Sequence, residues 1–301
     1  MKHPKNVIIL LLLYFLIIQI FSVLLITKYY STVENYTAPS NESAQGSLNW
    51  FIILFLLVTI AFIILSLKKF RKPIMFWTKI SIIVAFYLTL TLVFSILKFP
   101  QLWVDISAII FAILLYFVRK TSLRNLTEAF MYAGFVAMIL PLFNFKYLII
   151  LLIILSIYDF ISVRITKHMI LMANSQMEVS SFSGLQIDYN PNLEKNENLK
   201  EKINSSNVSM NKEINDDKIY VIKKVETKSA ILGGGDIAFP MILASYMAIN
   251  FGWIYGISVI LGSLIGLTII FKFSEKDKFY PAIPYLTFFM FLSLTLTKLI
   301  L

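Results

Sequence analysis

Long apolar runs alternate with short polar segments along most of this chain. A helix needs about 20 mainly apolar residues to cross the hydrocarbon core of a bilayer, and the pattern predicts nine such helices. The predicted helices are residues 7–27, 49–67, 74–97, 101–118, 126–143, 147–166, 229–249, 252–271 and 281–300. The pattern therefore favours an all-α polytopic membrane protein.

One long segment between the apolar runs is polar, with Asn, Ser, Glu and Lys dominating most of residues 168–228. It has too little apolar area to offset the entropy lost on ordering, so we expect a mobile loop. The chain then divides into a six-helix part (1–167), this loop, and a three-helix part (229–301). Near the end of the loop, β-branched and aromatic residues in Lys218–Glu226 predict a short strand before the seventh helix, with an extended linker as the alternative.

Composition excludes a single soluble domain, because 58% of the 301 residues are hydrophobic and only 15% are charged. The absence of cysteine excludes disulfides, thiolate metal sites and cysteine nucleophiles. The first apolar run follows Lys2 and Lys5 as in a signal peptide, but it is too long and lacks a small-residue cleavage site. We interpret it as a retained anchor in a multi-pass protein of the cell membrane.

The net charge of +10 is best explained by membrane orientation. Basic residues precede the first predicted helix and follow the second, fourth and sixth, and all of these positions lie on one side if nine helices alternate. The positive-inside rule then places the N-terminus in the cytoplasm and the C-terminus outside. Because the basic residues do not gather on one compact face, we expect no nucleic-acid partner.

Four acids interrupt or border the apolar runs: Asp105, Glu128, Asp159 and Asp236. An ionisable side chain inside a bilayer costs about 2.5 to 3.5 kcal/mol on insertion scales, so each needs an explanation. Asp105 and Glu128 lie near helix ends and can reach the interface. Asp159 and Asp236 lie about two turns from the cytoplasmic ends of the sixth and seventh helices. Antiparallel packing of these helices would bring both acids to the same depth.

Two carboxyl groups within hydrogen-bonding distance do not both ionise cheaply, so the pair holds one proton. Aspartyl proteolysis needs this arrangement, because the ionised group takes a proton from water while the protonated group polarises the scissile carbonyl. A structural or proton-relay pair in a transporter would use the same two acids. The acids alone do not separate these functions.

The residues around Asp236 favour proteolysis. Gly233–Gly235 carry no side chains, which allows close approach by a partner helix or an extended substrate. Pro240 lacks the amide that would bond the Asp236 carbonyl, so we expect the helix to bend or open there. Free backbone groups near the acids would help to hold a substrate that is locally unwound.

Two further clusters lie in the last helices. Pro281 and Pro284 mark an unusual first turn for the ninth helix. Ser258, Gly262 and Gly266 recur at four-residue spacing in the eighth helix, which we interpret as a packing face.

Three short motifs occur in order: Tyr158-Asp159 in the sixth helix, Gly233-Gly234-Gly235-Asp236 in the seventh, and Pro281-Ala282-Ile283 at the ninth. With these motifs on a nine-helix layout, the chain resembles the presenilin and signal peptide peptidase family of intramembrane aspartyl proteases, and its archaeal members in particular. The resemblance implies an aspartic endopeptidase whose catalytic residues are Asp159 and Asp236. It also implies an active site shaped by Tyr158, Gly233, Gly235, Pro281, Ala282 and Ile283.

The resemblance further implies that the strand at Lys218–Glu226 pairs with an unwound substrate. Expected substrates are transmembrane or signal-peptide-like peptides, and the predicted orientation matches the presenilin branch. We expect no cofactor, no metal and no obligate subunit. The family usually has Leu where this chain has Gly234 and Ile283. These departures bear on fine geometry and inhibitor binding more than on catalysis.

Other functions fit the residues less well. His3 and His168 are the only histidines, so no HExxH zinc site and no convincing serine–histidine pair exist. A prepilin-type peptidase shares the GxGD motif but not the ninth helix. The rival from another class is a proton-coupled transporter or cation channel that uses Asp159 and Asp236, although the sequence has no inverted repeat or paired half-helices. A structural scaffold leaves both acids unexplained.

Overall fold

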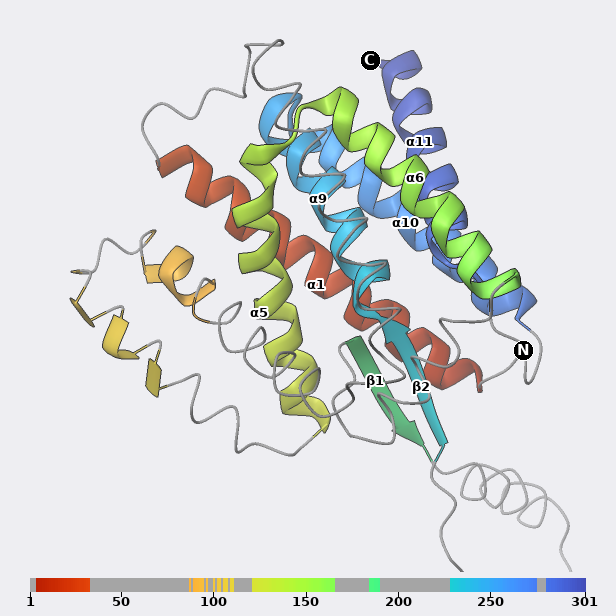
Figure 1. Cartoon of the computed structure of the whole chain (residues 1–301), viewed down its shortest axis with the longest axis horizontal. Helices are drawn as coiled ribbons and strands as arrows, with labels where there is room; N and C mark the ends of the chain where they lie inside the picture. The colour runs from red at the N-terminus through yellow and green to blue at the C-terminus, as the bar shows by residue number, and fades with distance from the viewer. Residues whose placement is uncertain are drawn as a thin grey trace, which may run out of the picture.

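The computed structural model describes residues 4–32, 121–165, 184–189, 228–274 and 280–301, with scattered positions between 87 and 110. These residues form six long helices, one short 3-10 turn and two strands (Figure 1). The elements are α1 (Lys5–Thr32), α5 (Thr121–Ile139), η1 (Leu140–Leu142), α6 (Phe145–Arg164), β1 (Gly184–Tyr189), β2 (Lys228–Gly233), α9 (Gly234–Asn250), α10 (Trp253–Phe273) and α11 (Ile283–Ile300).

The described helices follow the predicted apolar runs closely at both ends of the chain. Four of them, α1, α6, α10 and α11, are long and apolar enough to cross a membrane. The predicted helix 49–67, and most of 74–97 and 101–118, lie outside the described residues. The described part is therefore a mostly helical, polytopic membrane fold.

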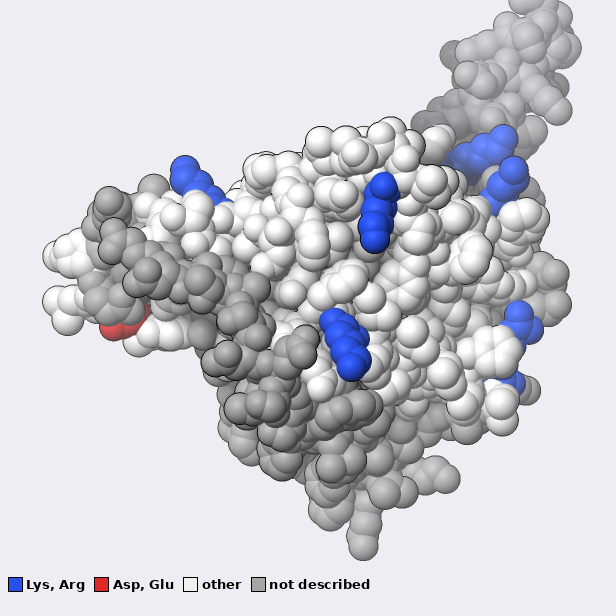
Figure 2. Space-filling model, turned by 90° about the horizontal axis from the view of Figure 1, so that it is seen from above, with Lys and Arg blue, Asp and Glu red and all other residues white. Residues whose placement is uncertain are grey.

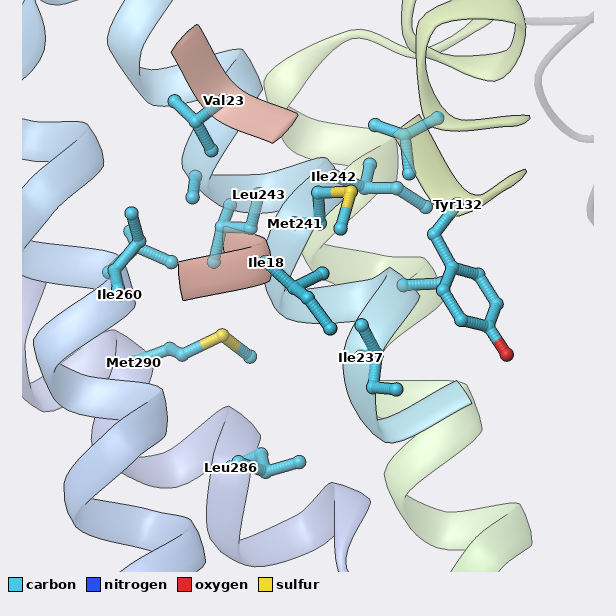
Figure 3. Packing of buried hydrophobic residues seen from close by; sticks show 14 of the residues in the cluster. Ile18, Val23, Tyr132, Ile237, Met241, Ile242, Leu243, Ile260, Leu286 and Met290 are labelled. Atoms are coloured by element: carbon cyan, nitrogen blue, oxygen red, sulfur yellow. The ribbon is translucent and has the colours of Figure 1, made fainter. Parts of the chain in front are cut away.

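Helix α9 is the central element of the described structure. It contacts every other described helix and both strands, and in Figure 1 it runs between α5 and α1 on one side and α6, α10 and α11 on the other. All residues from Pro240 to Ala248 are buried, as expected for a helix that is apolar on every face. Figure 3 shows Met241 and Leu243 of α9 packed among side chains of the neighbouring helices.

The outer surface is largely apolar. Helix α10 exposes Ile257, Leu261 and Ile265 at four-residue spacing, and α1, α6 and α11 also expose large aliphatic and aromatic side chains. Figure 2 shows one face on which uncharged residues predominate and basic residues are scattered. An apolar surface of this extent indicates contact with lipid.

Helices α10 and α11 pack through the predicted small-residue face, and this prediction is confirmed. Thr297 donates a hydrogen bond to the Ser258 hydroxyl at 2.7 Å. A methyl group on Gly262 would collide with the Ser293 side chain, and one on Gly266 would lie 3.0 Å from the Tyr285 carbonyl oxygen. Glycine at both positions therefore lets the two backbones approach closely.

The predicted start of the seventh helix, at residue 229, is wrong. Residues 229–233 belong to strand β2, which pairs antiparallel with β1 in the register Gly184↔Gly233 to Tyr189↔Lys228. The apolar run continues through the strand into α9, and hydropathy alone does not mark where one ends and the other begins. Strand β1 lies within the predicted loop, and the predicted strand Lys218–Glu226 lies outside the described residues.

Asn125 of α5 ties the sheet to the helices. Its side-chain amide donates to the Gln186 carbonyl at 2.7 Å and accepts from the Gln186 amide at 3.1 Å. The side chain therefore binds the edge of β1 at Gln186 as a neighbouring strand would. In an antiparallel pair, bonded and non-bonded residue pairs alternate, so Ile231 opposite Gln186 directs its own backbone groups to the far edge of β2.

The packing of α10 on α11 makes a stability prediction. Gly262→Val should lower the free energy of unfolding by about 1 to 3 kcal/mol, because the added side chain forces the two helices apart. Thermal unfolding of the detergent-solubilised protein measures this change. Leu261→Val, on the exposed side of the same turn, is the control and should have a much smaller effect. An unchanged melting temperature for Gly262→Val would contradict the close packing.

Candidate active site

Asp159 is buried in α6, with 2% of its surface exposed. Its Oδ2 atom accepts a hydrogen bond from the backbone amide of Ile283 at 3.1 Å. Ile283 is the first residue of α11, and the first amides of a helix have no partner within the helix. The carboxyl group of Asp159 therefore caps α11 from the side, which links the two predicted motifs directly.

The Pro281 segment has the local structure needed for this contact. Pro281 is buried just before α11, and Pro284 is in its first turn. Proline fits the first turn because its missing amide would have no helical partner there. The predicted start of this helix, residue 281, is two residues too early, because α11 begins at Ile283. The N-cap residue is Ala282, whose side chain makes no capping hydrogen bond to the helix.

Two further contacts lie on either side of Asp159 and join α6 to α11 and to the segment just before it. The Ser156 hydroxyl donates to the Thr287 hydroxyl of α11 at 2.9 Å. The Arg164 guanidinium lies 5.7 Å from the ring centroid of Tyr280, which precedes α11, within the range of a cation–π contact. Asp159 therefore lies between two side-chain contacts along this seam.

Asp236 is the third residue of α9, so it lies in the first turn and not two turns inside the helix as predicted. The backbone amide of Gly233, the N-cap residue, hydrogen-bonds its carboxyl group. A methyl group on Gly233 would lie 3.2 Å from Asp236 Oδ2, and one on Gly235 would lie 3.3 Å from the ring of Phe239. Both predicted glycines therefore stand at tight positions beside the acid.

The two acids lie on helices that are in contact, Asp159 on α6 and Asp236 on α9. Asp159 reaches α11 at the same time. The structure thus brings the residues of all three motifs to one place, with partly buried Tyr158 next to Asp159 on α6.

Of the predicted bend or opening at Pro240, the opening is wrong, since α9 is α-helical from Gly234 to Asn250. The Gln19 side chain of α1, fully buried, donates a hydrogen bond to the Ile237 carbonyl at 2.8 Å. This carbonyl is next to that of Asp236, which Pro240 leaves without its helical amide. The contact supplies a donor from another helix to the first part of α9.

The other two acids have different surroundings. Asp105 accepts a hydrogen bond from the Tyr87 hydroxyl at 2.6 Å, so its carboxyl group has a polar partner. Glu128 is part of α5, and its side chain lies outside the described residues. No group of three His, Cys, Asp or Glu side chains that could hold a metal ion occurs in the part of the chain that the structure describes.

Residues 12–291 match the family model for signal-peptide peptidase and presenilin aspartyl protease. The chain belongs to this family. Two solved structures, each of a presenilin family intramembrane aspartate protease, are similar to it. One has a TM-score of 0.62 at 17% identity, covering 98% of this chain and 99% of that chain. The other has a TM-score of 0.60 at 19% identity, covering 99% and 98%.

A search among curated proteins finds no match. Family membership makes the chain an intramembrane aspartic endopeptidase, and the two structures show its presenilin-like fold. The resemblance inferred from the three motifs is therefore confirmed at the level of the family. The transporter alternative is not favoured.

Sequence reasoning missed several residues that support this presenilin-family site: Gln19, Asn125, Ser156 and Thr287. Gln19 had a usable signal, because it is an amide in the middle of an apolar run, where such side chains bond to neighbouring helices. Ser156 and Thr287 are single hydroxyl residues of a kind that occurs throughout the helices, and the pairing of Asn125 with a strand has no local pattern.

The Ser156–Thr287 contact makes a prediction for the α6–α11 seam. Ser156→Ala and Thr287→Val should each lower the free energy of unfolding by about 0.5 to 1.5 kcal/mol. The double variant should lose no more than the larger single loss, because the bond is already absent in each single variant. Thermal unfolding in detergent measures all three, with Thr295→Val on the exposed side of α11 as the control. Fully additive losses would contradict the bond.

Proposed function

We propose that Asp159 and Asp236 are the catalytic pair with which this protease hydrolyses peptide bonds inside the membrane. The observation that carries the proposal is that α6 and α9, the helices that bear the two acids, are in contact, while Asp159 is buried in a membrane-spanning helix. Holding two such groups together is costly without a proton to share. Aspartyl catalysis requires a pair of carboxyl groups that share one proton, so it explains why the two acids are held together.

The mechanism uses one ionised and one protonated carboxyl group. The ionised group takes a proton from a water molecule whose oxygen attacks the scissile carbonyl carbon, and the protonated group donates its proton to the carbonyl oxygen. A neutral diol forms, and the two carboxyl groups have exchanged roles. On collapse the ionised group takes a proton from the diol, the carbon–nitrogen bond breaks, and the leaving nitrogen accepts a proton from the other carboxyl. The pair returns to its starting state.

We propose further that the substrate binds as a third strand along the edge of β2 that faces away from β1. Asn125 occupies the outer edge of β1 at Gln186, whereas Ile231 and, two residues before it, Ser229 direct backbone groups away from β1. Strand β2 continues directly into the turn that carries Asp236. A substrate added there is extended, with its backbone exposed, as cleavage requires. The strand predicted for this pairing, Lys218–Glu226, lies outside the described residues, and β2 is the described strand that reaches the site.

The broader assignments remain proposals that agree with family membership. Nine helices cross the cell membrane, with the N-terminus in the cytoplasm and the C-terminus outside. Residues 1–167 and 229–301 form the two helical parts, joined by the segment 168–228. The protease acts on transmembrane or signal-peptide-like segments, and it works without an obligate subunit, cofactor or metal.

The catalytic pair is tested by Asp159→Asn and Asp236→Asn. Each substitution keeps the shape of the side chain and removes its acid–base capacity, so each should lower the rate of cleavage by at least about a hundredfold. Purified protein in liposomes with a transmembrane peptide, followed by mass spectrometry, measures the rate. Unchanged thermal unfolding would show that the fold survives. Cleavage by either variant at the normal rate would contradict the assignment, and cation movement without cleavage would favour the transporter.

The substrate edge is tested by Ile231→Pro. The amide removed by this substitution faces away from β1, so the sheet should persist while one substrate hydrogen bond and the fit of the edge are lost. We expect the KM for a transmembrane peptide to rise at least about fivefold, because one net hydrogen bond contributes about 1 kcal/mol. Ala230→Pro is the matched control, because its amide faces β1 and its loss should lower the melting temperature. Unchanged kinetics in Ile231→Pro would contradict this edge.

A further inference from the structure

Tyr132 of α5 occupies the space beside Gly234, the middle residue of the glycine motif. A methyl group on Gly234 would collide with the Tyr132 hydroxyl, and it would lie 3.0 Å from Cζ and 3.2 Å from Cε1 of the same ring. Tyr132 is buried, with 6% of its surface exposed. Figure 3 shows its ring beside α9, with the hydroxyl directed toward the end of the helix at which Ile237 lies.

We propose that Tyr132 is a positioning residue for Asp236: it packs on the Gly234 backbone from α5 and fixes the first turn of α9. This inference rests on the proposed catalytic role of Asp236. The same contact accounts for glycine at position 234, because a methyl group there would collide with the Tyr132 hydroxyl. The volume that a side chain of α9 would fill is taken by a side chain of another helix.

The start of α9 needs an external support of this kind. Gly233 has an extended backbone (φ −65°, ψ 149°) and Gly234 is the first helical residue, so the chain changes direction here within consecutive glycines. Glycine has more backbone freedom than any other residue, and none of these glycines has a side chain to anchor the turn. Asp236 follows two residues later. A misplacement of about 1 Å at a reacting group costs about a hundredfold in rate. Backbone motion at Gly234 would displace the carboxyl group of Asp236 and so lower the rate.

Helix α5 is itself held on both sides of Tyr132. Seven residues earlier, Asn125 makes its two hydrogen bonds to β1. Five residues later, the Ala137 carbonyl accepts a hydrogen bond from the Tyr30 hydroxyl of α1 at 2.6 Å. Tyr132 therefore projects from a tethered stretch of helix. Its position against Gly234 is set by the sheet and by α1, and not by α9 alone.

A double-variant experiment tests the contact. Gly234→Ala places a methyl group where the Tyr132 hydroxyl lies, so kcat for a transmembrane peptide should fall at least about tenfold. Tyr132→Leu withdraws the hydroxyl and the end of the ring, so it should lower kcat moderately, leave KM nearly unchanged and shift the pH profile of kcat. The double variant should have a higher kcat than Gly234→Ala, because the methyl group then has room.

The control is Tyr246→Leu, which removes another buried tyrosine of equal exposure near the far end of α9. It should not rescue Gly234→Ala. Thermal unfolding of every variant separates positioning from stability. Rescue of the melting temperature with no change in kcat or pH profile would overturn the positioning role, and so would full activity of Gly234→Ala. If Gly234→Ala does not fold, an inactive but folded double variant overturns it.

These outcomes differ from a failure of the proposed function. If the unaltered protein does not cleave, or Asp236→Asn still cleaves, the catalytic assignment fails. If the unaltered protein cleaves through Asp236 and the two substitutions combine additively, only the role of Tyr132 fails.

Discussion

The hydrogen bond from the Ile283 amide to Asp159 is the contact on which the rest of the site depends. A carboxyl group buried in a membrane-spanning helix needs donors, and the unpaired amides at the start of a helix are donors that need an acceptor. Joining them satisfies both groups at once. The contact also fixes where α11 begins and how α6 lies against it, and the Ser156–Thr287 and Arg164–Tyr280 contacts maintain that seam.

On the other side of the site, the same requirement is met differently. Asp236 lies in the first turn of α9, next to the Gly233 amide, and it follows directly from a strand. The strand cannot carry the turn alone, because three consecutive glycines give it no side-chain anchor. The support comes from outside α9: Tyr132 packs on Gly234, Gln19 bonds the Ile237 carbonyl, and Asn125 holds β1. A central helix that contacts every other described element makes this arrangement possible.

The described helices, and the two acids on which the proposed function rests, leave strong local signals in the sequence. An apolar run of sufficient length predicts a span, and Asp159 and Asp236 are conspicuous because charge is costly there. Sequence reasoning placed the start of the seventh helix wrongly, at residue 229, because β2 is as apolar as the helix that follows and its partner β1 lies in a polar segment. The contacts of Tyr132 and Asn125 join distant parts of the chain. Their residue types carry no pattern that points to a partner, so only the fold reveals them.

The role proposed for the sheet follows from the physics of cleaving a peptide bond in a membrane. A helical substrate shields its peptide bonds, and an unwound one exposes backbone groups that lipid does not satisfy. If the unwound segment pairs with a strand beside the two acids, its scissile bond is exposed and its backbone groups still have hydrogen-bond partners. The proposed pairing uses the edge of β2 that faces away from β1, because a substrate on the edge of β1 would lie farther from Asp236. Asn125 occupies the edge of β1 at Gln186, and β2 leads directly into the turn that carries Asp236.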